Sequence, residues 1–294
     1  MTHIDNEANR NKRQHFVPQF YLRLFGNNKQ KVDVVLKNGE FHNNSIVSVA
    51  SRKYFYDSHL DKIIEGHGKR AVENILGVGE GIYAALFKRI LLNLMIKRVF
   101  SVHDKKLFAQ YLYFQFVRTN FMRTELKDSK FSKPFNNDEK IAQIFAIFGT
   151  HSDNNSFVDQ LLSKSWQILE NQLNYDLPTS DNPLVFTGDE SLLSDFFAKG
   201  KSGGLISNAL SVIYFPLSPR YLLKIYDLSE NALDIVGYEK LEWEEFKDYC
   251  ASLSIQSETQ VYCYPGGHTT TLMQRLALVF DSHKDEIATA CAET

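Results

Sequence analysis

The feature that most constrains this fold is a long helical pattern in the middle of the chain, which ends abruptly near residue 172. From about residue 60 to residue 170, apolar residues recur at the spacing that places them on one face of a helix. The next stretch, DLPTSDNPLVFTG, has the composition of a turn followed by a strand. The chain is therefore expected to combine a helical central region with sheet elements in an α+β fold.

Sheet elements are expected from both ends of the chain. The stretch KVDVVLKNGEFHNN places Asn38 and Gly39 between two strand-like runs, which predicts a hairpin with a type I′ turn. In the C-terminal third, ALSVIYFPLSPRYLLKIYD predicts two strands around a proline-bounded turn. Residues 1–13 are expected to form a disordered tail and residues 14–294 a single α+β domain. A subdivision near residue 172 is the alternative.

The composition excludes several classes of protein. The 44% of hydrophobic residues can fill a sizeable core, and the net charge of −2 argues against a surface covered in basic residues for duplex DNA. Three cysteines without a C-x-x-C pattern predict neither a disulfide framework nor a zinc ribbon. Charges interrupt the most apolar stretch, and the N-terminus has no apolar signal region. We therefore expect a cytoplasmic protein without a membrane span.

The N-terminal stretch QHFVPQFYLRLFG combines a helix signal with polar residues that the helix does not need. Its apolar positions lie on one face of a short helix that begins at Pro18 and ends before Gly26. His15 and Gln19 are not required for that face. A histidine just before a helix N-terminus can act as a general acid or base or bind a phosphate. The alternative is that His15 only fixes the entry of the chain by hydrogen bonding.

The helix that opens at Ser101 carries polar residues on the continuation of its apolar face. The spacing of its buried positions extends to Gln115 and Arg118. Burying a guanidinium without partners is costly. Arg118 is therefore expected to pair with a carboxylate or to hold an anionic ligand. A purely structural ion pair inside the fold is the alternative.

The turn TSDNP contributes the third group of candidates, Asp181 and Asn182. On a turn, a carboxylate and an amide can cap backbone groups, or they can face a substrate or a metal. Asp181 is the expected partner of Arg118, or a ligand for a hard metal such as Mg²⁺ or Mn²⁺. An Asx-type turn that leads into the strand LVF is the alternative.

Four fragments together resemble a known family. HFVPQFYLRLF, LFAQYLYFQFVRTNFMRTE, TSDNPLVF and FPLSPRYLL resemble, in this order, a large bacterial family catalogued as a domain of unknown function. Its hallmark is an N-terminal H-x-V-P-x-x-Y-L-x-x-F, and the resemblance spans roughly residues 14–265. The family typically has a proline where this chain has Asn120. The resemblance marks positions and implies no reaction.

A shorter pattern, Arg98 to His103, fits R-x4-H and resembles the signature of the all-helical HEPN ribonucleases. It straddles the helix start expected at Ser101, whereas those proteins carry it near or within a helix. A chance match is the alternative.

Three hypotheses on function follow from these residues. The first is a nuclease-like phosphate-ester hydrolase, in which His15 and Asp181 are catalytic and Gln115, Arg118, Gln19 and Asn182 bind substrate. Its partners would be nucleic acid or a phosphorylated small molecule. The second is a non-catalytic ligand-binding or regulatory protein that uses the same residues. The third is a toxin or phage-defence component that acts through a partner protein.

Overall fold

The computed structural model describes residues 13–58, 71–127, 129–149, 155–187, 212–227 and 236–292. The predicted disordered tail lies outside these residues except for Arg13, which begins a strand. The helices are α2 (Gln19–Leu22), α3 (Ala71–Met95), α4 (Val102–Arg118), α5 (Asn120–Leu126), α6 (Glu139–Phe148), α7 (Ser156–Ser163), α9 (Trp243–Gln256) and α10 (His268–Ala292). The strands are β1 (Arg13–His15), β2 (Lys31–Leu36), β3 (Phe41–Ser45), β4 (Ser51–Lys53), β5 (Ser165–Glu170), β6 (Thr179–Ser180), β7 (Val185–Thr187), β8 (Val212–Ser218), β9 (Tyr221–Tyr226), β10 (Gly237–Lys240) and β11 (Gln260–Cys263).

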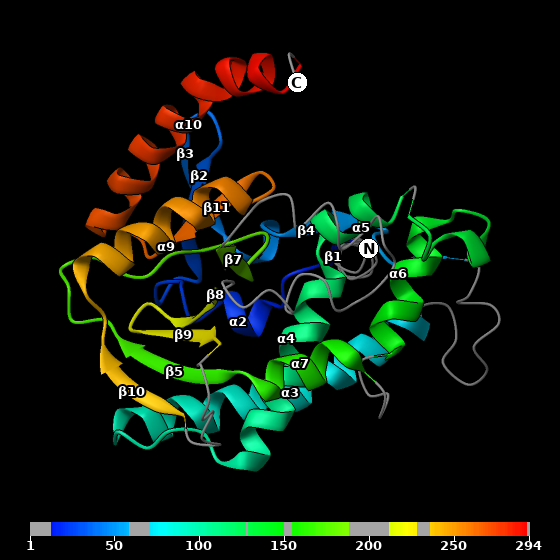
Figure 1. Cartoon of the computed structure of the whole chain (residues 1–294), viewed down its shortest axis with the longest axis horizontal. Helices are drawn as coiled ribbons and strands as arrows, with labels where there is room; N and C mark the ends of the chain where they lie inside the picture. The colour runs from blue at the N-terminus through cyan, green and yellow to red at the C-terminus, as the bar shows by residue number, and fades with distance from the viewer. Residues whose placement is uncertain are drawn as a thin grey trace, which may run out of the picture.

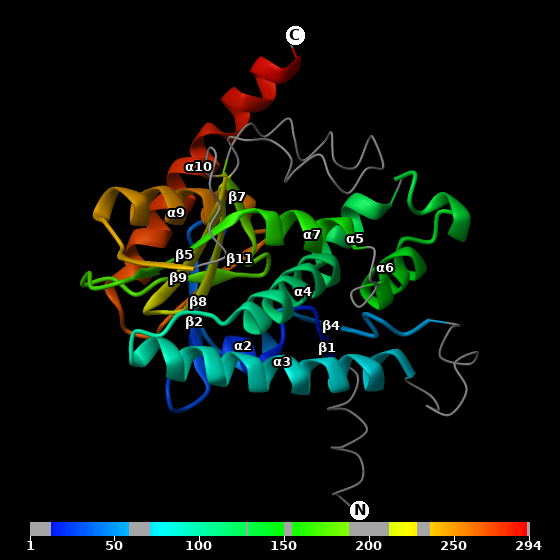
Figure 2. The same cartoon turned by 60° about the horizontal axis from the view of Figure 1, so that its bottom comes forward.

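The described strands form three sheets, with helices on two sides of them. The sheets have the orders β1-β4, β10-β5-β9-β8-β7 and β3-β2-β11-β6. Helices α3 to α7 lie together on one side of the molecule, and α9 and α10 lie at the other (Figures 1 and 2). The α+β prediction is confirmed. The sheets take strands from the N-terminal hairpin and the C-terminal third, as predicted, but β5, β6 and β7 come from residues 165–187, before that third.

The four-stranded sheet joins the two ends of the chain. The hairpin strands β2 and β3 pair antiparallel, and β11 adds to the free edge of β2. The predicted type I′ turn is wrong, because only Gly39 has a positive φ, at 79°, and Asn38 does not. The Gly39 N–H donates to the Leu36 carbonyl, which closes the turn one residue earlier. The loop is thus a turn followed by a left-handed glycine.

The five-stranded sheet corrects the predicted end of the helical region. The run SWQILE at residues 165–170 was expected to be helical, but it forms β5, which pairs with β9 and β10. Every residue of β5 is buried. A strand covered on both faces loses the alternation of apolar and polar residues, so its pattern resembles that of a buried helix.

A break between α4 and α5 falls where the family is expected to have proline. The Ser101 hydroxyl caps α4 by accepting from the Asp104 N–H, as predicted. After Arg118 the backbone of Thr119 is extended, with ψ at 157°, and the Thr119 hydroxyl caps α5. Asn120 is the first residue of α5, the position where proline is favoured, because its N–H needs no helical partner. The chain keeps the break without the proline.

The N-terminal motif is anchored in the main core. Tyr21 is fully buried, and its hydroxyl donates to the Pro216 carbonyl and contacts the Thr179 hydroxyl, each at 2.8 Å. Its ring lies 5.2 Å from that of Phe215. The short helix is confirmed, although it begins at Gln19 rather than Pro18.

Among the described residues, no helix combines the length and the hydrophobicity that a membrane crossing requires. Cys250 and Cys263 are buried and free, and burial raises the pKa of both thiols. A raised pKa keeps a thiol protonated, so neither is an activated nucleophile.

Candidate functional site

A pocket of about 370 Å³ lies where the N-terminal motif meets α3 and α4. His15 and Gln19 reach it from β1 and α2, Glu80 from α3, and Arg118 from the last residue of α4. Three of the six residues singled out in the sequence therefore share one hollow, although they are up to 103 positions apart.

The local structure explains how His15 reaches the pocket. β1 pairs with β4, and His15 is opposite Ser51. The Gln14 side chain donates to the Asp57 carboxylate and accepts from the Tyr56 N–H, each at 2.5 Å. These contacts tie β1 to the segment after β4 and leave the next side chain, His15, facing the opposite way.

Arg118 is 1% exposed and held by three groups. Its Nη2 donates to the His15 carbonyl at 2.6 Å and to Glu80 Oε1 at 2.7 Å, and its Nε contacts the Tyr56 hydroxyl at 3.4 Å. Burial acts to lower the pKa of Arg118, but Tyr56 and Glu80 outweigh it and raise the pKa. The guanidinium is therefore permanently charged. Its Nη1 has no hydrogen-bond partner among the described residues.

The expected carboxylate partner of Arg118 exists, but it is Glu80 and not Asp181. Glu80 lies in the middle of α3, between Gly79 and Gly81. Its carboxylate is partly exposed, at 29%, in the wall of the pocket. Glu80 was not predicted as the partner, since a single glutamate in a long helical pattern is ordinarily a solvated side chain.

His15 is neutral and has a defined tautomer. Burial lowers its pKa to about 4; Glu80 opposes this shift and Arg118 adds to it. The Gln19 amide nitrogen lies 3.3 Å from His15 Nδ1, and Arg23 donates to the amide oxygen of Gln19 at 3.0 Å. An amide nitrogen can only donate, so Nδ1 accepts and the proton of the neutral ring lies on Nε2.

His15 Nε2 is the second unsatisfied donor at this site. It is buried and has no hydrogen-bond partner among the described residues. The nearby backbone of Ile46 and Val47 favours the protonated ring but completes no hydrogen bond with Nε2. Two residues that line the pocket, His15 and Arg118, thus each contain a buried donor nitrogen without a hydrogen-bond partner in the described part of the chain.

Gln115 fixes the backbone of the N-terminal motif without lining the pocket. It is fully buried and donates to the Phe16 carbonyl at 3.2 Å, next to the His15 carbonyl that Arg118 holds. It does not line the pocket. Gln115 and Arg118, one helical turn apart, thus fix two successive carbonyls of the N-terminal motif.

Two glycines of α3 keep the pocket open. Gly77 and Gly81 line it, and a Cβ built on either would meet no atom within 4 Å. Packing therefore does not require glycine at these positions, although glycine inside a helix costs about 1 kcal/mol relative to alanine. The signal was present in the sequence as three glycines, 77, 79 and 81, within a helical pattern.

Asp181 and Asn182 lie in a different part of the fold. The Asp181 carboxylate is 2% exposed and accepts from the N–H groups of Glu258, Thr259 and Gln260 and from the Thr259 hydroxyl, at 2.7–3.0 Å. Burial raises its pKa, and these four hydrogen bonds oppose the shift. Asn182 donates to the Gln256 carbonyl at 3.1 Å. The alternative of a structural turn describes both residues, and neither lines the pocket.

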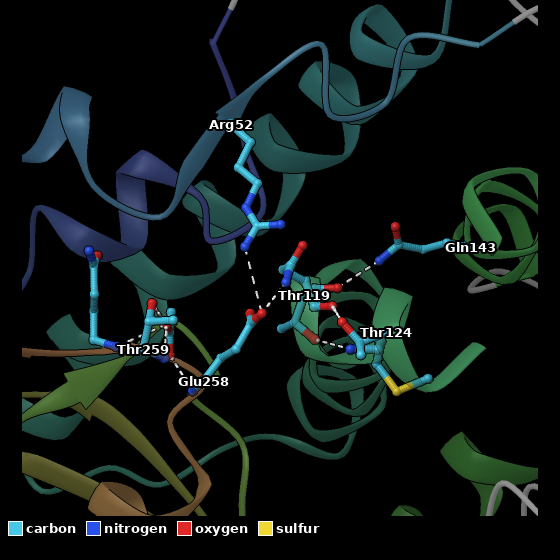
Figure 3. Close-up of polar contacts among 10 residues, drawn as sticks. Arg52, Thr119, Thr124, Gln143, Glu258 and Thr259 are labelled. Carbon is cyan, nitrogen blue, oxygen red and sulfur yellow. Dashed lines mark hydrogen bonds and ion pairs between the residues drawn. The ribbon is translucent and has the colours of Figure 1, made fainter. Parts of the chain in front are cut away.

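A second polar cluster surrounds the break between α4 and α5 (Figure 3). Gln143 donates to the carbonyls of Val117 and Thr119, at 2.8 and 2.7 Å. Glu258 accepts from the Asn120 amide and lies 3.7 Å from the Arg52 guanidinium. Burial, followed by the charge of Asp181, raises the pKa of Glu258. This cluster holds the helix break against the loop that Asp181 caps.

In the described ranges, no three His, Cys, Asp or Glu side chains gather in a way that could hold a metal ion. All oxygens of Asp181 face protein donors, so its expected role as a metal ligand has no support from the geometry. Arg98 and His103 of the R-x4-H pattern are both exposed, on either side of the start of α4. Neither lines the pocket.

A family model described as "Protein of unknown function (DUF4238)" matches residues 13–235, which include the pocket and its N-terminal motif. No curated protein and no solved structure matches the chain.

Proposed function

The chain belongs to the DUF4238 family, and from that premise we propose that it is a non-catalytic binding protein whose pocket at His15 and Arg118 takes a small acidic molecule. The observation that carries the proposal is Arg118 Nη1, a buried charged donor without a partner among the described residues. A charged donor left unpaired in the interior costs about 1–3 kcal/mol or more. Arg118 lines the pocket, and a ligand oxygen that reached Nη1 from there would remove that cost.

The charges of the pocket disfavour a ligand with more than one negative charge. Arg23 and Arg118 line the pocket together with Glu73 and Glu80, so its formal charges balance while His15 is neutral. A phosphate dianion would face repulsion from two carboxylates. A carboxylate oxygen can accept a charge-assisted hydrogen bond from the one unpaired nitrogen of Arg118 and brings less charge. The acidic group is therefore proposed to be a carboxylate.

The nuclease-like hydrolase has less support from the same geometry. In the tautomer that Gln19 selects, His15 Nδ1 accepts from an amide and Nε2 carries a proton, so the ring offers a donor and no free base. Asp181, the second proposed catalytic group, is occupied by backbone donors outside the pocket. A role with a protein partner or in phage defence, and a cytoplasmic location, stay predictions from the sequence.

Binding of propionate and of inorganic phosphate by isothermal titration calorimetry tests this proposal. We expect wild-type protein to bind propionate in preference to phosphate. Gly81→Leu should weaken propionate binding by about tenfold or more, because its side chain would occupy the hollow. Val78→Leu is the matched control, since Val78 is 69% exposed on the same helix and does not line the pocket.

Equal affinity of wild-type protein and Gly81→Leu would contradict the binding site. Incubation with RNA and DNA, with and without Mg²⁺ or Mn²⁺, separates the enzymatic alternative. Cleavage by the wild-type protein that His15→Ala abolishes would favour the hydrolase instead.

A further inference from the structure

We propose that the ligand of the His15 pocket is an amphipathic monocarboxylate, such as a medium-chain fatty acid, whose tail lies in an apolar groove along α3. This inference rests on the proposed function and specifies its substrate class. The groove is a second hollow of about 270 Å³, and its walls include Leu24, Leu91, Leu92 and Met95.

The groove continues the pocket. Phe20 of α2 and Ala84 of α3 belong to the walls of both hollows, so the two adjoin at these side chains. The charged side chains of the first hollow are absent from the walls of the second, which are apolar except for Lys88. Figure 2 shows α2 resting against the middle of α3, where this junction lies.

One face of α3 runs through both hollows. The α3 residues of the pocket (73, 76, 77, 80, 81, 84) and those of the groove (84, 87, 88, 91, 92, 95) follow the spacing of three and four that defines a single helical face. Along this face the side chains change from Glu80 at the pocket to Leu91 and Leu92. The rise of the helix places Glu80 and Leu92 about 18 Å apart. The surface is thus polar at one end and apolar at the other.

The groove leaves large apolar side chains open to solvent. Leu92 is 55% exposed and Met95 71% exposed. A bound alkyl chain would remove this surface from water, which favours binding roughly in proportion to the area covered.

The sizes favour one small molecule over a partner protein. Each hollow has a volume of about the size that a small ligand fills. Only a single molecule with an acidic head and an alkyl tail uses the unpaired donors and the adjoining apolar walls at once.

Titration calorimetry with propionate, decanoate, decanol and decyltrimethylammonium tests this inference at concentrations below micelle formation. We expect decanoate to bind wild-type protein about tenfold or more tightly than propionate, because only decanoate reaches the groove. Decanol and decyltrimethylammonium should bind about tenfold or more weakly than decanoate, because neither offers a carboxylate to Arg118.

Leu92→Glu should reduce decanoate affinity to that of propionate and leave propionate binding unchanged. Ile82→Glu is the matched control. Ile82 is 51% exposed on the same helix and lines neither hollow, so this variant should bind decanoate as the wild-type protein does.

The outcomes separate this inference from the proposed function. Equal affinity for propionate and decanoate would overturn the tail site and leave the carboxylate pocket intact. Failure to bind either acid would overturn both. Equal binding of decanoate and decyltrimethylammonium, or a concentration-dependent dimer in size-exclusion chromatography that Leu92→Glu dissociates, would also overturn the inference, because the groove would then serve apolar contact or a second copy of the chain.

Discussion

The His15 pocket and the loop capped by Asp181 are built from the same kinds of residues, but their hydrogen bonding differs. Both bring a buried charged side chain together with backbone groups from distant parts of the sequence. At Asp181 four donors surround one carboxylate. At Arg118 one donor nitrogen is left without a partner among the described residues, and a hollow lies beside it.

This difference separates structural polar groups from candidate binding groups. A buried polar network that is fully satisfied stabilises the fold and has nothing left to offer a ligand. An unsatisfied donor beside open space is destabilising unless a ligand or water pairs with it. An unpaired buried donor on a residue that also lines a hollow therefore carries more information on function than the residue type does.

The largest expected effect is from Asp181→Ala. Removing the carboxylate leaves three backbone N–H groups and the Thr259 hydroxyl without their acceptor, which should lower the free energy of unfolding by about 3–5 kcal/mol. Urea unfolding measures this change, and Asp181→Asn, which keeps one acceptor oxygen, should lose less. If Asp181→Ala folds, its propionate affinity should match that of wild-type protein. Loss of binding in a folded variant would place Asp181 in the site after all.

Gln143→Ala should have the next largest effect, about 2–4 kcal/mol of unfolding free energy. The Gln143 side chain donates to two buried carbonyls at the α4–α5 break and accepts from Arg123 Nε at 2.9 Å. Its removal would leave these groups without a hydrogen-bond partner. Thr124→Ala, on the exposed side of the same break, is the control and should change stability by less than about 0.5 kcal/mol (Figure 3). Equal effects of the two variants would remove the distinction between the satisfied cluster and ordinary surface contacts.

Lowering the pH should destabilise the protein through His15. Its pKa is about 4 in the folded protein and about 6.5 when unfolded, so the unfolded chain binds more protons between these values and stability falls as the pH decreases from 6.5 towards 4. The loss between neutral pH and pH 5 is expected to be on the order of 1–2 kcal/mol.

The contribution of His15 is isolated by comparison with a variant. His15→Gln should lose that part of the pH dependence of urea unfolding, whereas His42→Gln, which alters an exposed histidine on β3, should retain it. An unchanged slope in His15→Gln would show that His15 is solvated in the native state.

The smallest expected change, and the one with the opposite sign, is from Gly81→Ala. Alanine is favoured over glycine in a helix, and its Cβ would meet no atom within 4 Å, so thermal unfolding should show a gain of up to about 1 kcal/mol. Gly79→Ala is the control, because its Cβ would lie 3.9 Å from the Phe114 ring, an ordinary contact, and should give a similar gain. Only Gly81→Ala should weaken propionate binding. A loss of stability in Gly81→Ala but not in Gly79→Ala would show that the fold itself requires glycine at position 81.

Much of the fold could be predicted from local patterns. The short helix after Pro18, the cap at Ser101 and the strands on either side of residues 219 and 220 depend on neighbours in the sequence, and the structure contains each of them. The pattern failed at residues 165–170, where burial on both faces removed the period that distinguishes a strand from a helix. The type I′ turn predicted at Asn38 and Gly39 was also wrong, because the turn closes between Leu36 and Gly39 and only Gly39 has a positive φ.

The candidate site divides in the same way. From the sequence alone, the apolar spacing around Arg118 predicted that this guanidinium would be buried and would need an anionic partner, either a carboxylate or a ligand. The N-terminal motif placed His15 just before a helix whose apolar face does not require it. Only the tertiary structure decided that the carboxylate partner of Arg118 is Glu80. It also decided that the Asp181 carboxylate accepts hydrogen bonds from the loop at residues 258–260, and that Gly77 and Gly81 line the same hollow as Arg118. The physical reason is that burial of a residue follows from local periodicity, whereas the identity of its partner depends on long-range packing of segments that periodicity does not relate.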